Sequence, residues 1–434
     1  TVNGVTATAT RRIKAADETV RLRRRALQQS YYLAAKQLLP VTPPWGALAG
    51  VRPTKITTKH LLEGGTPKSA DELLRDVYYV TDDRRRLAID CSVSTVRAVN
   101  MLQPSDLSLY VGIPFCPTRC TYCSFVSRTI GRKTELLEPY LRALEQEIAV
   151  TGRLLAQSGR TVRTLYIGGG TPTTLSAPQM ERLLRVIRDN FDLSRCVEFT
   201  VEGGRPDTLD LEKLQVIRSG GADRMSINPQ TMEDSVLRAC GRPHTGADVI
   251  RAYHQAEEAG FSAINMDLIA GLPGEDAADM QDTLEKIEKL HPDSLTVHAL
   301  AIKRAAKFGQ EGRTMDPGTE ITQMVEAAAA SAERMGLVPY YLYRQKNIAG
   351  NFENVGYAEQ DKAGVYNILI MEERQTIFAC GAGPTTKLVL PEKIKTSSGK
   401  ETNLIRVENV KNITEYIDRI DEMIERKEAL FEKD

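Results

Sequence analysis

Apolar and polar positions alternate with two different periods from about residue 107 onward. Six short runs have the length and composition of buried strands, at residues 107–113, 164–168, 197–201, 224–228, 263–269 and 294–300. Amphipathic segments with helical spacing follow these runs, at residues 139–157, 178–190, 209–218, 246–258, 277–290 and 319–335. Six strand–helix units in a row predict parallel pairing through right-handed crossovers, and so an α/β fold with a full or partial barrel.

The flanks of this series have other patterns. Helical spacing at residues 15–39 and a loop rich in Pro and Gly at 40–53 predict a helical extension before the barrel. Shorter strands and a charged helix at 413–433 follow it. We therefore expect three units, which are a helical N-terminal extension at 1–100, a partial (β/α)6 barrel at 101–337 and a small α+β C-terminal region that covers the substrate at 338–434.

Composition and charge exclude several classes of partner. The 434 residues carry 57 basic and 57 acidic side chains, so no net charge favours a nucleic acid or a membrane surface. The basic cluster at 21–25 is typical of a solvated helix face. No apolar stretch approaches the ~20 residues that span a bilayer, and no signal-peptide pattern is present, so we expect a cytoplasmic protein.

Three of the seven cysteines lie within eight residues, in the segment Cys116-Pro-Thr-Arg-Cys120-Thr-Tyr-Cys123. Three thiolates on one tight loop can bind three irons of a 4Fe-4S cluster, while the fourth iron stays free of protein. That iron could chelate the amino and carboxylate groups of S-adenosylmethionine (SAM). One electron would then break the sulfonium bond and release a 5'-deoxyadenosyl radical.

Two other interpretations of this cysteine loop stay open. Structural zinc prefers four protein ligands, but the loop has no fourth Cys or His, and His60 and His244 are far away in sequence. Unliganded thiols are the second alternative. The position after the first predicted strand favours a cluster, because the carboxyl ends of parallel barrel strands carry the chemistry. The remaining cysteines, Cys91, Cys196, Cys240 and Cys380, are expected to pack in the core.

Further candidates follow the later strands. The run Gly168-Gly169-Gly170-Thr171 ends the second strand, where glycines let the backbone approach a ligand and offer carbonyl oxygens to the amino group of SAM. A glycine turn that only closes the strand is the alternative. Polar residues that could hold the SAM carboxylate or adenosine are Glu202, Gln230, Arg242 and Asp267, with His298 as a weaker candidate for the substrate pocket. Each such residue alone is more often a surface, capping or core side chain.

Together these residues resemble a known family. The segments Phe115-Cys-Pro-Thr-Arg-Cys-Thr-Tyr-Cys-Ser-Phe125, Gly168-Gly-Gly-Thr-Pro172 and Asn265-Met-Asp-Leu-Ile-Ala-Gly-Leu-Pro273 resemble the oxygen-independent coproporphyrinogen III oxidase (HemN-like) family of radical SAM proteins. Gly50-Val-Arg-Pro-Thr-Lys55 and Tyr340-Tyr-Leu-Tyr-Arg-Gln-Lys-Asn-Ile-Ala-Gly350 look most like its HemZ branch, the coproporphyrinogen dehydrogenase-like proteins. The match runs from about residue 50 to the end.

The resemblance implies a radical SAM oxidoreductase of heme biosynthesis. Coproporphyrinogen III would lose carbon dioxide from two propionates, which become vinyl groups. The family's catalytic group would be Tyr110 with Cys116, Cys120 and Cys123. The residues implied around the first SAM are Gly169, Gly170, Thr171, Glu202, Gln230, Arg242, Asp267 and Ala301. Some members bind a second SAM, but the sequence shows no clear ligands for one, and a flavodoxin or ferredoxin would supply the electron.

Two departures keep other activities open. Where the founding oxidases have His, this chain has Gly112, and where they have Gly-Cys it has Ser124-Phe125. In both it sides with sister branches that include a heme-trafficking protein and heme-degrading methyltransferases. The alternatives are therefore methyl transfer or another radical modification of a tetrapyrrole or metabolite, and a non-enzymatic heme-binding carrier. A tetrapyrrole is the expected substrate class, with propionates paired to cations such as Arg128, Arg344 and Lys346.

Overall fold

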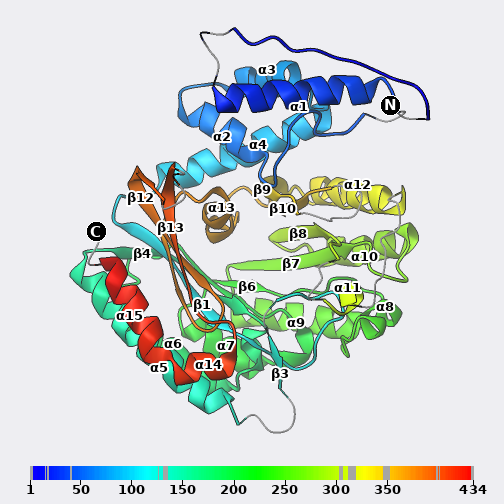
Figure 1. The fold of residues 1–434 in the computed structure, drawn as a ribbon. Helices are drawn as coiled ribbons and strands as arrows, with labels where there is room; N and C mark the ends of the chain where they lie inside the picture. The colour runs from blue at the N-terminus through cyan, green and yellow to red at the C-terminus, as the bar shows by residue number, and fades with distance from the viewer. Residues whose placement is uncertain are drawn as a thin grey trace.

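The structure is a computed structural model that describes residues 3–431 except 15, 17–18, 40–41, 126, 131–134, 303–305, 311–318, 346–351, 397–398 and 400. An 11-stranded sheet with the order β13-β12-β11-β1-β4-β5-β6-β7-β8-β10-β9 forms its centre (Figure 1). Six consecutive strands of this sheet are parallel. They are β1 (Asp106–Ile113), β4 (Thr161–Gly169), β5 (Glu198–Glu202), β6 (Arg224–Ser226), β7 (Ala263–Ala270) and β8 (Ser294–Ala299). The predicted α/β fold with six parallel strands is confirmed.

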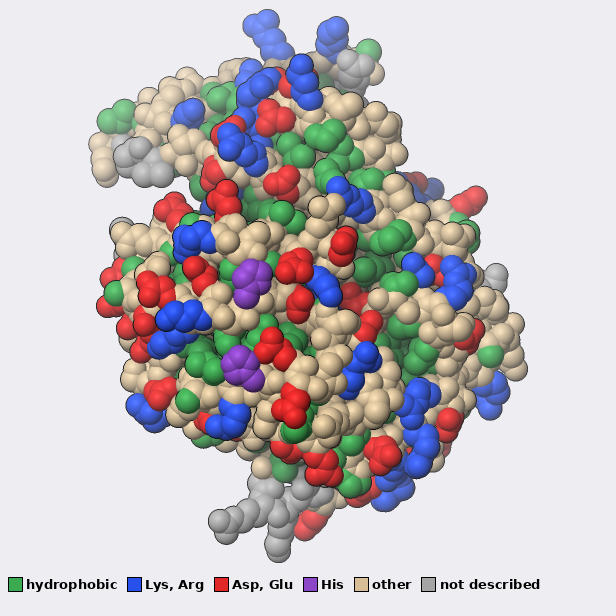
Figure 2. Space-filling view, turned by 180° about the vertical axis from the view of Figure 1, so that it is seen from behind, with side chains coloured by type: hydrophobic (Ala, Val, Ile, Leu, Met, Phe, Trp, Pro, Cys, Tyr) green, Lys and Arg blue, Asp and Glu red, His purple; other side chains and the backbone are tan. Residues whose placement is uncertain are grey.

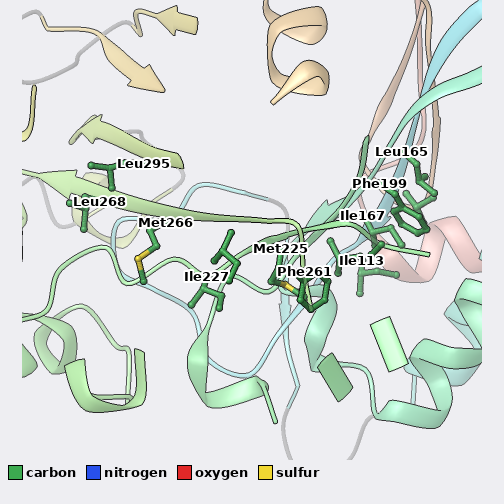
Figure 3. Packing of buried hydrophobic residues seen from close by; sticks show 14 of the residues in the cluster. Ile113, Leu165, Ile167, Phe199, Met225, Ile227, Phe261, Met266, Leu268 and Leu295 are labelled. Atoms are coloured by element: carbon green, nitrogen blue, oxygen red, sulfur yellow. The ribbon is translucent and has the colours of Figure 1, made fainter. Parts of the chain in front are cut away.

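Helices follow these strands and cover the sheet. They are α5 (Leu137–Gln157), α6 (Ala177–Asn190), α7 (Leu211–Ser219), α9 (Gly246–Ala259), α10 (Ala277–Leu290) and α12 (Thr319–Arg334). Capping boxes fix the first turns of α6, α9 and α10, because in each the N-cap side chain and the third helical residue satisfy each other's backbone N–H. Figure 3 shows strand side chains such as Ile167, Met225 and Leu268 in one continuous apolar cluster. A short helix, α8 (Asp234–Ala239), was not predicted from the apolar pattern.

Strands beyond residue 338 extend the sheet at both edges. At one edge β11 (Ile377–Cys380) pairs in parallel with β1, and β12 (Thr385–Lys395) and β13 (Glu401–Glu408) continue antiparallel. At the other edge β10 (Asn354–Ala358) and β9 (Val338–Tyr343) add antiparallel to β8. The C-terminal region therefore shares the barrel's sheet, and the division into three units stays a prediction.

Helices occupy both ends of the chain. The N-terminal ones are α1 (Val20–Lys36), α2 (Thr54–Leu62), α3 (Pro67–Tyr78) and α4 (Asp82–Asn100), which form the layer at the top of Figure 1. Basic side chains gather at this end (Figure 2). Arg21, Arg23 and Arg24 of α1 are exposed. The predicted C-terminal helix is instead two helices, α14 (Ile413–Asp418) and α15 (Ile420–Phe431), because Arg419 leaves the helical conformation. Among the described residues, no helix is long and apolar enough to cross a membrane.

Short polar contacts join the N-terminal region to the rest of the chain, and two of them lie between buried side chains. The indole N–H of Trp45 donates to Glu353, 2.8 Å away, and the hydroxyl of Thr54 donates to Glu372 at 2.7 Å. All four side chains are buried, so each bond is shielded from water and satisfies a group that burial would otherwise leave unpaired. The helical layer is thus held against β10 and α13 (Val365–Glu372), which border the barrel opening.

Candidate functional site

A cavity of about 660 Å³ lies at the centre of the sheet. Inward-facing side chains of the parallel strands form one part of its wall, among them Tyr110 of β1, Glu202 of β5 and Asp267 of β7. The C-terminal region forms another part, with Tyr366 of α13 and Lys387 of β12. Because strands from both edges of the sheet line one space, the C-terminal region builds the cavity together with the barrel.

The cysteine loop begins where β1 ends. The hydroxyl of Tyr140 on α5 donates to the carbonyl of Gly112 at 2.6 Å, which fixes the end of β1 just before the loop. Strands β2 (Phe115–Cys116) and β3 (Arg128–Thr129) then pair in parallel across the loop's base. The backbone N–H of Thr171 donates to the carbonyl of Phe115 at 2.7 Å. The loop is therefore held by α5 on one side and by the end of β4 on the other.

The three thiols of this loop occupy different surroundings. The hydroxyl of Thr171 lies 3.5 Å from Cys116 Sγ, a guanidinium nitrogen of Arg242 lies 3.8 Å from Cys120 Sγ, and Cys123 lines the cavity. Burial raises the pKa of Cys116 and raises that of Cys123 to about 11. Within the described part of the chain, no three His, Cys, Asp or Glu side chains are arranged to hold a single metal ion. In a cubane cluster each thiolate binds a different iron, so the three sulfurs need not converge on one point.

The glycine run at the end of β4 lets two backbone segments meet. Gly169 has φ +118°, a conformation that favours glycine, and it lines the cavity. A Cβ on Gly170 would lie 2.5 Å from the carbonyl oxygen of Phe115, which is closer than real contacts allow. Gly169 thus faces the cavity, whereas Gly170 and Thr171 pack against the cysteine loop.

The carboxylates predicted as ligands face the cavity. Burial, with Asp267 nearby, raises the pKa of Glu202 to about 8. Asp267 accepts a hydrogen bond from Asn265 at 2.8 Å and lies 3.7 Å from Nε2 of His298. Two acids and an imidazole therefore share one wall, and a bound donor group would relieve the desolvation of Glu202.

Gln230 lies in an unusual backbone conformation. Its φ is +72°, which non-glycine residues rarely adopt, and backbone bonds to Asp267 and Ile269 on β7 hold it there. Its Oε1 atom is buried and has no hydrogen-bond partner among the residues that the structure describes. Because buried polar atoms are normally paired, this oxygen marks a place where a ligand donor fits.

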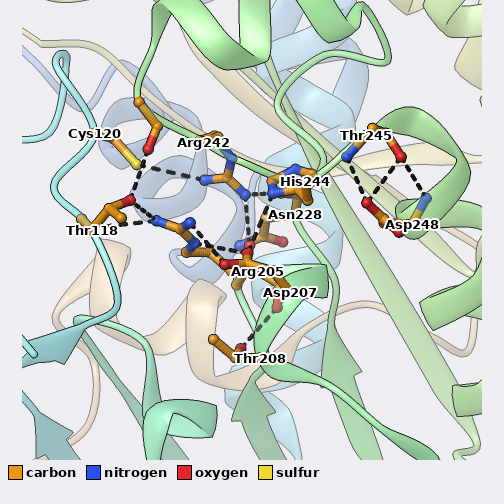
Figure 4. A network of polar contacts seen from close by, with 12 residues as sticks. Thr118, Cys120, Arg205, Asp207, Thr208, Asn228, Arg242, His244, Thr245 and Asp248 are labelled. Atoms are coloured by element: carbon orange, nitrogen blue, oxygen red, sulfur yellow. Dashed lines mark hydrogen bonds and ion pairs between the residues drawn. The ribbon is translucent and has the colours of Figure 1, made fainter. Parts of the chain in front are cut away.

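The structure divides the predicted residues into two groups. Those that line the cavity are Tyr110, Cys123, Gly169, Glu202, Gln230, Asp267, His298 and Ala301. Those outside the lining are Cys116 and Cys120 of the cysteine loop itself and the residues that contact this loop, Gly170, Thr171 and Arg242 (Figure 4). The substrate cations differ from expectation, since Arg128 is exposed on β3 and Arg344 packs over the ring of Trp45. Lys346 is outside the described residues.

Sequence reasoning missed an aromatic wall and one cation. Tyr166 and Tyr366 stack on Tyr110, with ring centroids 6.0 and 6.2 Å from it, and all three line the cavity. Tyr166 could have been found, because the predicted pairing of the first two strands sets it beside Tyr110. Tyr366 and Lys387 carry no such signal, since the sequence does not reveal that their elements return to this cavity.

Comparison with known proteins gives consistent results. The model of the radical SAM superfamily matches residues 110–287. The chain is 40% identical over 404 residues to the oxygen-independent coproporphyrinogen-III oxidase-like protein HemZ of Bacillus subtilis, covering 91% of this chain and 79% of that protein. It is 33% identical over 285 residues to the heme chaperone HemW of the same organism, covering 64% and 69%. The solved structure of the Escherichia coli radical SAM enzyme coproporphyrinogen III oxidase (HemN) superposes with a TM-score of 0.60 at 25% identity, covering 76% and 72%.

Proposed function

Because the chain belongs to the radical SAM superfamily, and within it to the HemZ and HemN-like coproporphyrinogen III oxidase family, we propose that it cleaves SAM reductively to act on a tetrapyrrole. The observation that carries the proposal is a loop of three cysteines at the edge of a cavity lined by unsatisfied polar groups. The most similar relative named above matches across nearly the whole chain, which supports carrying the family's chemistry to this site.

The cofactors of this family are a 4Fe-4S cluster and SAM, and the residues present fit both. Cys116, Cys120 and Cys123 would hold three irons of the cluster. When bound, the reduced cluster and SAM supply a 5'-deoxyadenosyl radical that removes a hydrogen atom from the substrate. Gly170 and Thr171 keep the loop in place, through the close approach and the hydrogen bond described above.

The cavity side chains would bind SAM in separate roles. Glu202 would accept hydrogen bonds from the ribose hydroxyls, and the unpaired oxygen of Gln230 would accept one from the adenine or amino group. Asp267 would face the amino group, while Gly169 and Ala301 leave room for the adenosine. Arg242 joins this set through the family resemblance. One SAM fits these groups, and the described residues offer no second set that we can assign.

The reaction we propose is oxidative decarboxylation of coproporphyrinogen III. Loss of a hydrogen atom from a propionate β-carbon, of carbon dioxide and of one electron to an acceptor leaves a vinyl group. Among the described residues that line the cavity, Lys387 is the only Lys or Arg. Its ammonium group would pair with a substrate propionate that lies in the cavity. The aromatic wall of Tyr110, Tyr166 and Tyr366 would contact the pyrrole rings.

A second candidate is a heme carrier, which the similarity to a heme chaperone favours. Anaerobic incubation of reconstituted protein with SAM, a reductant and coproporphyrinogen III, followed by mass spectrometry, separates the candidates. Two losses of carbon dioxide support the decarboxylase. Formation of S-adenosylhomocysteine indicates methyl transfer, and stoichiometric heme binding without turnover indicates the carrier. SAM consumption with every tetrapyrrole unchanged contradicts the decarboxylase.

We also propose an electron donor and a cellular location for the reaction. A flavodoxin or ferredoxin would deliver the electron, and the reaction would take place in the cytoplasm. Reduction of the reconstituted cluster by a purified flavodoxin, followed in an anaerobic spectrophotometer, tests the first of these.

A further inference from the structure

A second cavity, of about 540 Å³, lies between the N-terminal helices and the C-terminal region. Helices α1 and α2 form one wall, and the segment after α13 and the β12–β13 hairpin form the other, just below the helical layer in Figure 1. The volume is within the range of sites that hold small molecules. We call this cavity the basic cleft after the cations among its described lining residues, which are Arg21, Arg25, Lys55, Lys59, His60 and Arg374.

One carboxylate of the basic cleft is shared by three cations. Glu373 lies 2.7 Å from a guanidinium nitrogen of Arg52, 2.8 Å from Nζ of Lys55 and 2.8 Å from a guanidinium nitrogen of Arg406. Although burial acts in the opposite direction, the hydrogen bonds from Lys55 and Arg52 lower the pKa of Glu373 to about 2, so this acid is ionised. Three cations against one carboxylate leave two positive charges unbalanced at this point.

The two arginines of α1 add to this excess. Arg21 and Arg25 lie one helical turn apart, and neither has a hydrogen bond or ion pair with any residue that the structure describes. The remaining acids of the cleft do not balance them, because Glu63 lies 3.4 Å from Lys59 and burial raises the pKa of Glu372, which favours its neutral form. The basic cleft therefore carries a positive charge that an anionic ligand would balance.

Apolar side chains complete the lining of the basic cleft. Val389 of β12 and Leu404 of β13 are paired directly opposite each other, and Ile56, Leu73 and Tyr78 line the cleft from the helical layer. All but Tyr78 are only half-buried, so they leave apolar surface open to the cleft. A ligand with an apolar body and several anionic groups at its edge matches this combination of surfaces.

The basic cleft adjoins the central cavity along the β12–β13 hairpin. Side chains two residues apart on a strand point to the same face, so Lys387 shares a face with Val389. Arg406 is paired directly opposite Lys387 and shares this face with Leu404. Lys387 lines the central cavity, whereas Val389 lines the basic cleft. The two cavities are therefore neighbours on one face of the hairpin.

We propose that the basic cleft binds a tetrapyrrole that carries several carboxylates, at a second site outside the central cavity. Arg21 and Arg25 pair with carboxylates at the edge of the ligand, and Val389 and Leu404 contact its rings. The choice of a tetrapyrrole rests on the proposed function, whereas the excess of positive charge is a property of the cleft itself. A tetrapyrrole bound there lies next to the central cavity, which favours its transfer between the two sites.

Calorimetric titration of the reconstituted protein with coproporphyrin III, without oxygen and with SAM present, tests this proposal. The wild type should bind two molecules. Arg21→Gln combined with Arg25→Gln should weaken one of these sites by about tenfold and leave the other unchanged. Arg24→Gln combined with Lys36→Gln is the matched control, because it removes two charges from exposed positions of α1 outside the described lining, and it should keep both sites. Equal affinities in the wild type and in the Arg21 and Arg25 double variant overturn the proposal.

Further measurements cover misfolding and other ligands. If thermal unfolding shows that the double arginine variant is not folded, Lys59→Gln, which changes a side chain that is 51% exposed, should weaken the same site, and an unchanged site overturns the proposal. Displacement of coproporphyrin III from this site by an equal concentration of pyrophosphate assigns the cleft to phosphates and overturns the choice of a tetrapyrrole.

The failure of this inference differs from the failure of the proposed function. Wild-type protein that cleaves SAM and decarboxylates coproporphyrinogen III but binds no second porphyrin removes the inference alone. Protein that binds a second porphyrin in the basic cleft but holds a full cluster without cleaving SAM removes the proposed reaction alone.

Discussion

The Nζ of Lys427 lies 2.7 Å from the carboxylate of Glu147, and neither side chain exposes more than 1% of its surface. This ion pair joins the last helix, α15, to the first barrel helix, α5. Glu147 also accepts hydrogen bonds from the N–H of Gly381 at 2.7 Å and from the hydroxyl of Tyr416 at 2.5 Å. Since Tyr140 of α5 fixes the end of β1, the C-terminal helices support the cysteine loop indirectly.

Breaking this pair on one side should destabilise the fold strongly. Lys427→Met leaves the carboxylate of Glu147 buried without its cation, and we expect a loss of about 3–5 kcal/mol in the free energy of unfolding. Urea denaturation measures it. Lys427→Met combined with Glu147→Gln should be more stable than the single lysine variant, because no charge is then left unpaired. Replacement of Arg419, whose pair with Glu422 is at the surface, should have little effect. A single variant as stable as the wild type would contradict the role of the pair.

Gly170 should not tolerate a side chain. Gly170→Ala places a methyl group 2.5 Å from the carbonyl oxygen of Phe115, so one of the two backbone segments must move. We expect a destabilisation of about 1–3 kcal/mol and a lower iron content after reconstitution. Gly159→Ala is the control, because its Cβ meets nothing within 4 Å although φ is +64°. Equal iron content in both variants would show that the close approach does not position the cysteines.

The stability of the cofactor-free protein should depend on Glu202. Its pKa is raised from 4.5 to about 8, so the folded state binds a proton more tightly than the unfolded state does. Stability from this group is full below pH 4.5 and falls as the pH rises to about 8. Because the carboxyl keeps some surface open to the cavity, Glu202→Gln should be more stable above pH 8 by roughly 1–3 kcal/mol.

Glu202→Gln should also bind SAM less tightly than the wild type, because an amide oxygen accepts hydrogen bonds more weakly than a carboxylate. Thermal unfolding from pH 4.5 to 9 measures the pH dependence of stability, and calorimetric titration with SAM measures the affinity for SAM. Parallel stability curves for the variant and the wild type would show that Glu202 keeps its ordinary pKa.

Lys387 should recognise a carboxylate of the substrate. Lys387→Gln removes the cation from the cavity wall, and we expect about tenfold to hundredfold weaker binding of a tetrapyrrole with propionates, equivalent to about 1.4–2.8 kcal/mol. The amount of 5'-deoxyadenosine formed without substrate should stay the same. Arg128→Gln is the matched control, since Arg128 is exposed and outside the cavity. Equal losses of tetrapyrrole affinity in both variants would show that the overall positive charge of the protein attracts the propionates, without a specific contact to Lys387.

The barrel was predictable because its signals are local. Each parallel strand is buried on both faces and reads as an apolar run, and capping residues such as Ser176 and Thr245 mark where helices begin. The cysteine loop and Glu202 followed from their positions after strands. The predictions for Gly170, Thr171 and Arg242 named residues near the site, but only three-dimensional contacts show that these residues face the loop.

The C-terminal half of the cavity was not predictable from one sequence. Strand β11 pairs with β1 although Ile377 and Ser108 lie far apart in the chain, and no local pattern encodes such a pairing. The stacked Tyr366 and the cation Lys387 reach the cavity only through it. The bond from Arg205 to Thr118 was hidden for a similar reason, since the two residues lie 87 positions apart and meet only in the folded barrel.

The central claim is that the loop from Cys116 to Cys123 holds a cluster that supplies the electron for SAM cleavage. Anaerobically reconstituted wild-type protein, incubated with SAM and dithionite, should release 5'-deoxyadenosine in a chromatographic assay. Cys120→Ala should release none and lose the visible absorption of the cluster, whereas Cys196→Ala, which changes a partly buried cysteine elsewhere, should behave as the wild type. Equal 5'-deoxyadenosine from the wild type and Cys120→Ala, or none from wild-type protein with full iron content, would contradict the account.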